Sequence, residues 1–171
     1  FEFHVQNKYN LNIIANDKFE PLYNFWEICK HEKKGLCDRL YERIDKIEKE
    51  DFLRYREEII TKKQKSGLER AELYFIINRC SFSGSTLSGG FSLEASKKRF
   101  TNSSIDRINQ LDLSNFSMYN LDFKDFIKTH HKENTLLFLD PPYYLEKSQA
   151  KLYGKNGDMH EKFEHEKLYE S

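Results

Sequence analysis

The chain has 171 residues, with 28 Lys and Arg against 28 Asp and Glu, so its formal net charge is zero at pH 7. A uniformly basic coat for nucleic acid is therefore excluded, and any polyanion has to bind at a local cationic patch. Aromatic residues make up 15% of the chain, which is too many for a disordered chain. Charged residues make up 33%, which is too many for a membrane protein.

The first half of the chain predicts one strand followed by helices. The apolar run Leu11–Ala15 stops at Asn16 and Asp17, as a short strand would. Pro21 suits the first turn of a helix, and the apolar residues from Leu22 to Cys29 recur at the spacing of one buried helical face. Similar spacing predicts helices over Leu36–Ile47, Asp51–Lys65 and Leu68–Asn78, the last of which could also be read as a buried strand.

The second half begins with a loop and predicts two more strands. Ser81–Ser92 is rich in Ser and Gly and is predicted to be a loop. Phe116–Asn120 alternates like a strand, and Phe123–Thr129 follows as a short helix. Thr135–Leu139 is apolar at four of its five positions and predicts a strand buried in a parallel sheet.

Each of the three predicted strands is followed by an aspartate, namely Asp17, Asp122 and Asp140. Ligands of open α/β sheets bind outside the carboxyl ends of the strands, so three such carboxylates would face one crevice. Asp is also common in turns and helix caps, and each residue alone has that ordinary interpretation. Together the three favour a ligand site.

The third aspartate opens the segment Asp140-Pro141-Pro142-Tyr143. Two consecutive prolines remove two N–H donors and leave unpaired carbonyls beside the carboxylate. An acceptor-only site of this kind suits an exocyclic amino group, and the Tyr143 ring can stack on a flat heterocycle. A Pro-rich turn with a packed Tyr is the alternative interpretation.

This segment resembles the catalytic motif of the amino-group DNA methyltransferases, and the chain resembles their D12-class, Dam-like, adenine-specific branch. Four further segments carry the resemblance. They are Asn16-Asp17 with Leu22, similar to "N-D-x-x-x-x-L"; Asn78–Gly84, similar to "N-R-x-x-x-N-G" with Ser83 in place of the last Asn; Asp122-Phe123; and Phe163-Glu164-His165 with Leu168. The family's cofactor motif F-x-G-x-G has no counterpart, so we expect a fragment of a longer chain.

The resemblance implies an α/β fold. We expect a Rossmann-like, S-adenosylmethionine-dependent methyltransferase sheet with an inserted helical and loop target-recognition region, incomplete at both ends. Residues 1–80 and 114–171 would belong to one catalytic domain, and residues 81–113 would form the inserted region.

The resemblance also implies roles for individual residues. The target adenine would be flipped out of the duplex. Asp140 and the Pro141 carbonyl would then bind its amino group, while Pro142 holds the loop and Tyr143 stacks on the base. S-adenosylmethionine would be bound by Asp17, Asp122, Phe123 and Asp140. DNA would be contacted by Arg79, Ser81, Lys97, Lys98, Arg99 and Arg107, although an ordinary solvated charged face is the alternative for these residues.

The function predicted from the sequence is site-specific methylation of adenine N6 in double-stranded DNA, with a cognate restriction endonuclease as a candidate partner. An RNA amino-group methyltransferase acting on ribosomal RNA is one alternative, and a truncated, non-catalytic DNA-binding remnant is another. His130, His131, His160 and His165 lack the spacing of converging metal ligands, so we expect no metal. Three Cys without a C-x-x-C pair, and no run long enough to span a bilayer, predict a cytoplasmic protein.

Overall fold

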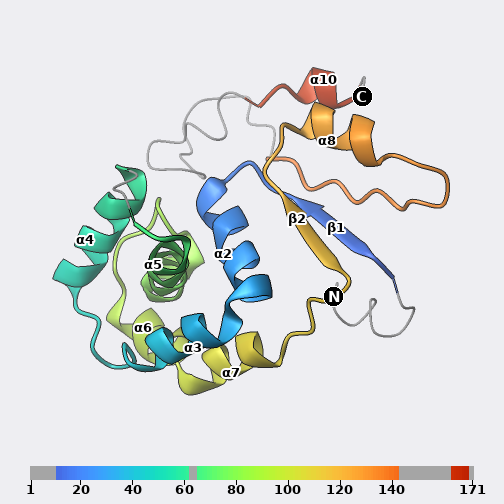
Figure 1. Ribbon diagram of the computed structural model, residues 1–171. Helices are drawn as coiled ribbons and strands as arrows, with labels where there is room; N and C mark the ends of the chain where they lie inside the picture. Colours follow the sequence, from blue (N-terminus) through green and yellow to red (C-terminus); the bar gives the residue numbers. More distant parts are fainter. Residues whose placement is uncertain (1–10, 62–64, 143–162, 170–171) are drawn as a thin grey trace.

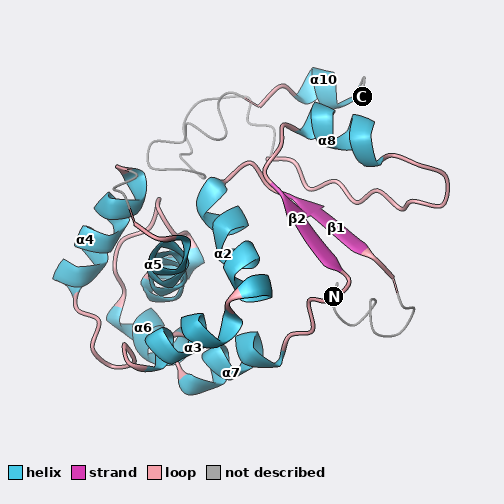
Figure 2. Ribbon diagram, in the orientation of Figure 1, coloured by secondary structure: helices cyan, strands magenta, loops and turns pink. Residues whose placement is uncertain are grey.

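The computed structural model describes residues 11–61, 65–142 and 163–169, which form a helical part beside a small sheet (Figures 1 and 2). The elements in chain order are β1 (Ile13–Asn16), α2 (Glu20–His31), α3 (Lys33–Tyr41), α4 (Lys49–Ile60), α5 (Gly67–Cys80), the short 3₁₀ turn η1 (Phe82–Gly84), α6 (Leu93–Arg99), α7 (Asn102–Gln110), β2 (Phe116–Tyr119), α8 (Phe123–His130) and α10 (His165–Tyr169).

The sheet consists of β1 and β2, which run parallel with Ile13 opposite Phe116 and Asn16 opposite Tyr119. Both strands lie where the sequence predicts them. Parallel neighbours need a crossover connection, and here the crossover is the whole helical part from α2 to α7. Helix α2 covers the sheet, with the Trp26 ring 5.5 Å from the ring of Phe116. The fold is therefore mixed helix and strand, and the sheet of the described residues has two parallel strands, fewer than the predicted Rossmann-like sheet requires.

Helix α5 forms the centre of the helical part. Every residue from Ala71 to Ile77 is buried, which is typical of a helix covered on all sides. Its N-terminus is a capping box, in which Ser66 accepts from the Glu69 N–H at 3.2 Å and Glu69 accepts from the Ser66 N–H at 3.0 Å. The structure thus confirms the helix over Leu68–Asn78.

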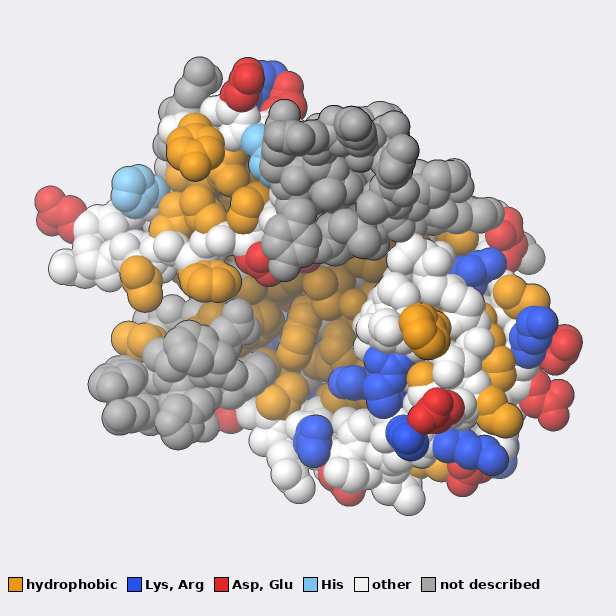
Figure 3. All heavy atoms as spheres, turned by 180° about the vertical axis from the view of Figure 1, so that it is seen from behind, with side chains coloured by type: hydrophobic (Ala, Val, Ile, Leu, Met, Phe, Trp, Pro, Cys, Tyr) orange, Lys and Arg blue, Asp and Glu red, His pale blue; other side chains and the backbone are white. Residues whose placement is uncertain are grey.

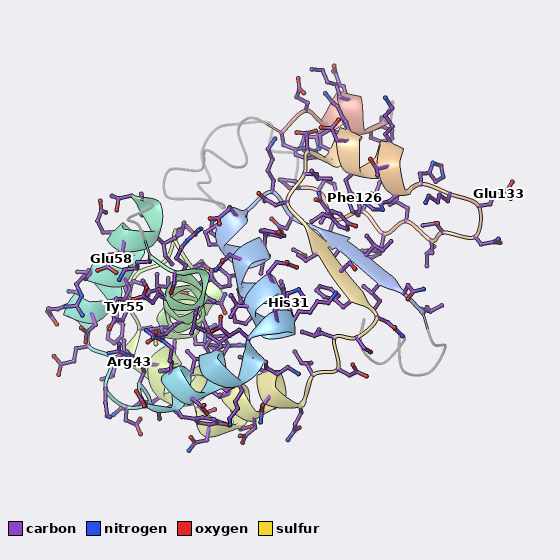
Figure 4. All side chains as sticks on the ribbon, viewed as in Figure 1. His31, Arg43, Tyr55, Glu58, Phe126 and Glu133 are labelled. Carbon is purple, nitrogen blue, oxygen red and sulfur yellow. The ribbon has the colours of Figure 1, made fainter. Side chains whose placement is uncertain are left out.

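One buried position of α5 carries a charge. Glu72 is 2% exposed, and its two carboxylate oxygens accept from Arg39 at 2.6 Å and Arg43 at 2.9 Å. These side chains line a polar cavity of about 210 Å³ between α3, α4 and α5, near Tyr55 and Glu58 (Figure 4). The paired guanidiniums compensate a carboxylate that would be costly to bury alone.

The helix predicted over Leu36–Ile47 is shorter in the structure. Helix α3 ends at Tyr41, and Asp45 takes a left-handed backbone conformation with φ of 59°. A residue in that conformation cannot continue a right-handed helix. Ile47 is still buried, so its apolar character reflects core packing outside a helix.

Helices α6 and α7 each begin at a side-chain N-terminal cap. The Ser92 hydroxyl accepts from the Ala95 N–H at 3.1 Å, and Thr101 forms a capping box with Ser104. Phe100 and Ile105 are buried in the same hydrophobic core as α2 and α5. The described residues of the region 81–113 therefore share one core with α2 and α5.

The prediction of a strand over Thr135–Leu139 is wrong. The segment lies in a long loop that leaves α8 and turns near Glu133, at the outer end of the loop in Figure 4. Leu136 is 94% and Phe138 83% exposed. An apolar strand is stable only between neighbouring strands and covered faces. Neither β1 nor β2 pairs with this run, which leaves it uncovered.

Over the described ranges, no helix is both long and apolar enough to cross a membrane.

Candidate functional site

The carboxyl ends of β1 and β2 bring two of the three predicted aspartates to one edge of the sheet. The Asp17 N–H donates to the Tyr119 carbonyl at 3.1 Å, continuing the ladder by one bond beyond β1. Asn120 donates from its side chain to the Asp17 carbonyl at 2.8 Å. Asp122 follows two residues later, at the N-terminus of α8. The parallel register therefore positions the two acidic residues together, as the sequence predicts.

Asn16 extends this ladder with its side chain. Its amide nitrogen donates to the Leu121 carbonyl at 3.1 Å, and its amide oxygen accepts from the Leu121 N–H at 2.9 Å. The pair of bonds imitates a backbone ladder and connects the residue before Asp17 to the residue before Asp122. In the sequence, Asn16 stands out only as part of a motif, and nothing in the sequence marks Asn120 as a site residue.

Asp17 is half-buried and lies just before the first turn of α2. One carboxylate oxygen accepts from the Phe19 N–H at 2.7 Å. Burial raises the pKa of Asp17, and the Phe19 hydrogen bond opposes that shift. The pKa of Tyr74 on α5 is raised to about 12, first by burial and then by the negative charge of Asp17. The second Asp17 oxygen makes no hydrogen bond to any residue that the structure describes, so it can accept from a ligand.

Asp122 is used as a helix cap and in an ion pair. Its carboxylate accepts from the Lys124 N–H at 3.2 Å and pairs with the Lys18 ammonium at 2.7 Å. The pKa of Asp122 is lowered, mainly by the hydrogen bond from Lys18. The next residue, Phe123, contacts the Phe163 ring at a centroid distance of 5.2 Å. The downstream segment that includes α10 therefore packs on α8 at this edge.

The segment that begins with Asp140 is only partly described. Asp140 is exposed, and Pro141 and Pro142 are half-buried. Tyr143 lies outside the described residues. Because Thr135–Leu139 is not a strand, the sheet itself does not position Asp140 beside the other two aspartates.

The loop after α5 is built from internal hydrogen bonds. Asn78 donates from its side chain to the Gly84 carbonyl at 3.3 Å and to the Thr86 hydroxyl at 3.1 Å. Ser81 is 0% exposed, and its hydroxyl donates to the Asn78 carbonyl at 3.2 Å and accepts from the Thr86 N–H at 3.0 Å. Ser81 therefore holds the loop together and has no surface with which to contact DNA, contrary to its predicted role.

Arg99 also has a structural contact. Its guanidinium donates to the carbonyls of Ser81 and, at 3.4 Å, of Asn78, so it covers the C-terminal end of α5. Lys97 is exposed, while Lys98 is exposed but pairs with Glu94 at 2.6 Å.

The two remaining residues of the predicted DNA-binding set lie on α5 and α7. Arg79, in the last turn of α5, lies 5.0 Å from the centre of the Phe75 ring, and Arg107 is exposed on α7. Figure 3 shows Lys and Arg side chains gathered on the helical part of one face, beside a hollow lined by hydrophobic side chains.

The chain belongs to a known family of methyltransferases. The D12 class N6 adenine-specific DNA methyltransferase family matches over residues 1–171. The chain is thus a member of a family of adenine-specific DNA methyltransferases, in agreement with the resemblance found in its motifs. No curated protein matches the chain. In the described ranges, no three His, Cys, Asp or Glu side chains are grouped as metal ligands.

Proposed function

We propose that this chain carries the methyl-transfer chemistry of a site-specific DNA adenine N6-methyltransferase. The observation that carries the proposal is the edge formed by Asp17 and Asp122, in a chain that belongs to the adenine-specific family. Polar residues at the carboxyl ends of adjacent parallel strands are the usual ligand-binding groups of open α/β sheets.

Asp17 fits the ribose of S-adenosylmethionine because its carboxylate accepts hydrogen bonds. The carboxylate is held by the Phe19 N–H through one oxygen, which leaves the other free to accept from ribose hydroxyls. Asp122 and Phe123 would lie along the adenine and methionine portions. When bound, the cofactor supplies an electrophilic methyl group on its sulfonium.

Asp140 and the Pro141 carbonyl are proposed to accept the two hydrogens of the flipped adenine amino group. Holding both hydrogens directs the nitrogen lone pair away from the ring and toward the methyl group. Asp140 is also the base available for the proton that the nitrogen loses after transfer. Pro142 fixes the loop, and Tyr143 would stack on the base. Positioning then supplies most of the rate acceleration.

The test is the identity of the methylated product. The chain, alone and within any longer natural chain that contains it, is incubated with methyl-labelled S-adenosylmethionine and either duplex DNA or ribosomal RNA, and the nucleosides are separated after digestion. We expect N6-methyladenine from DNA. Label found only in RNA would replace the proposal with the RNA methyltransferase alternative, and DNA binding without any transfer would favour the non-catalytic remnant.

Two variants assign the roles within the site. Asp140→Ala is expected to abolish transfer while cofactor binding persists, and Asp17→Ala is expected to weaken cofactor binding itself. Lys34→Ala, at an exposed position of α3, is the matched control. An active Asp140→Ala enzyme would refute the catalytic role. A place in restriction–modification, with a cognate endonuclease, is proposed on the family resemblance alone.

A further inference from the structure

Tyr74 on α5 lies beside Asp17 without a hydrogen bond between the two side chains. The Phe19 N–H donates to one Asp17 oxygen at 2.7 Å, and the ring of the same Phe19 packs on the Tyr74 ring at a centroid distance of 6.0 Å. This contact arises because Phe19 comes just before α2, which packs along α5 (Figure 1). Phe19 therefore brings the Asp17 carboxylate and the Tyr74 phenol to the same edge of the sheet.

The Tyr74 ring is held in place by a second aromatic contact. The Phe25 ring, also from the α2 side, lies 5.5 Å from it. Tyr74 is 8% exposed, so its ring belongs to the hydrophobic core. Packing on two rings sets the position of the hydroxyl at the end of the phenol.

The Tyr74 hydroxyl has no hydrogen-bond partner in the ranges that the structure describes. The hydroxyl of a buried Tyr normally has one. Burial, and then the negative charge of Asp17, raise the pKa of Tyr74 to about 12, and the positive charge of Arg79 opposes the shift. The hydroxyl therefore keeps its proton at neutral pH and is available as a donor.

Asp17 and Tyr74 together match a vicinal diol better than Asp17 does alone. A carboxylate only accepts hydrogen bonds, whereas each hydroxyl of a diol both donates and accepts. The second Asp17 oxygen can accept from the diol, but the oxygens of the diol then still need a donor. Tyr74 supplies such a donor from the adjacent helix.

We propose that the Tyr74 hydroxyl donates a hydrogen bond to a ribose hydroxyl of S-adenosylmethionine, while Asp17 accepts from the same diol. This inference deepens the proposed function and rests on it for the identity of the cofactor. Tyr74 is then a specificity-determining residue. A deoxyribose has no vicinal diol and would leave one of the two side chains unpaired, which disfavours its binding.

The test is calorimetric binding of S-adenosylhomocysteine, which has the ribose and lacks the transferable methyl group. The chain is used alone and within any longer natural chain that contains it. Tyr74→Phe keeps the ring, removes the hydroxyl and should weaken binding about five- to tenfold, as loss of one hydrogen bond does. Tyr41→Phe is the matched control and should leave the affinity unchanged, since the Tyr41 hydroxyl donates to Asp106 on α7.

The 2′-deoxy and 3′-deoxy forms of the same ligand separate a ribose contact from a structural role. For the form that lacks the hydroxyl contacted by Tyr74, the unmodified chain and Tyr74→Phe should bind equally. Because the Tyr74 hydroxyl has no described partner in the free chain, Tyr74→Phe should also keep or raise the melting temperature. Equal loss of affinity for all three ligands together with a lower melting temperature would overturn the proposal, as would unchanged affinity for S-adenosylhomocysteine in Tyr74→Phe.

None of these measurements requires methyl transfer or DNA, so the two proposals fail separately. A protein that shows the ribose-dependent loss and methylates no DNA would retain the Tyr74 contact and lose the proposed function. A protein that methylates adenine, and whose cofactor affinity does not depend on Tyr74, would retain the function and lose the contact. Failure of the unmodified protein to bind S-adenosylhomocysteine would overturn both.

Discussion

Asn16 offers a direct test of how the two acidic residues are held at one edge of the sheet. Asn16→Ala removes both side-chain hydrogen bonds to Leu121, of 3.1 and 2.9 Å, and leaves the backbone ladder of β1 and β2 in place. A typical hydrogen bond contributes about 1 kcal/mol net to stability. The expected loss is therefore about 2 kcal/mol, with some relief because water can reach a half-buried position.

Urea unfolding measures this loss with an intrinsic probe. Trp26 is the single tryptophan of the chain, and it packs on Phe116 of β2, so its fluorescence reports on the contact between α2 and the sheet. Asn120→Ala removes the one side-chain bond to the Asp17 carbonyl and should cost about half as much. Asn102→Ala, at an exposed position of α7, is the control.

The functional consequence follows from the position of the Asn16–Leu121 hydrogen bonds between the two acidic residues. If Asn16 holds Asp17 and Asp122 in register, Asn16→Ala should weaken S-adenosylmethionine binding more than Asn120→Ala does. A loss of stability no larger than that of Asn102→Ala would refute the reasoning. Full stability loss with unchanged cofactor affinity would limit Asn16 to a purely structural role.

Three other outcomes are expected from the structure. Asp17→Asn should stabilise the fold at neutral pH, because burial raises the pKa of Asp17. The stability that the protonated form of Asp17 provides is complete below about pH 3.8 and is lost as pH rises through the folded-state pKa. Urea unfolding should therefore show that the stability gained by the variant disappears toward acid pH. Arg39→Met with Arg43→Met leaves Glu72 buried and unpaired, and should cost about 3–5 kcal/mol in the same assay; equal stability would show that Glu72 needs neither partner. Gly84→Ala, at φ of 74°, should cost about 1–2 kcal/mol, and thermal unfolding with no loss would contradict the strain argument.

The sequence was sufficient for elements whose pattern is local. The strand β1, the helices α2 and α5 and the strand β2 follow from periodicity and flanking residues, and all four are found in the structure. Thr135–Leu139 has an equally clear apolar pattern and still forms no strand. Its pairing depends on neighbouring strands far away in the sequence, and the pattern of the run itself contains no information about them.

The candidate site shows the same division between local and non-local information. Asp17 and Asp122 could be predicted to meet because both follow parallel strands. The hydrogen bonds between the Asn16 side chain and Leu121 could not be predicted, because they depend on the register between strands that are far apart in the sequence. Similarly, the charge of Arg99 predicted a contact with DNA, and only the structure shows that its guanidinium donates to the loop carbonyls. A residue type predicts which groups can bind, and the fold decides which partners are within reach.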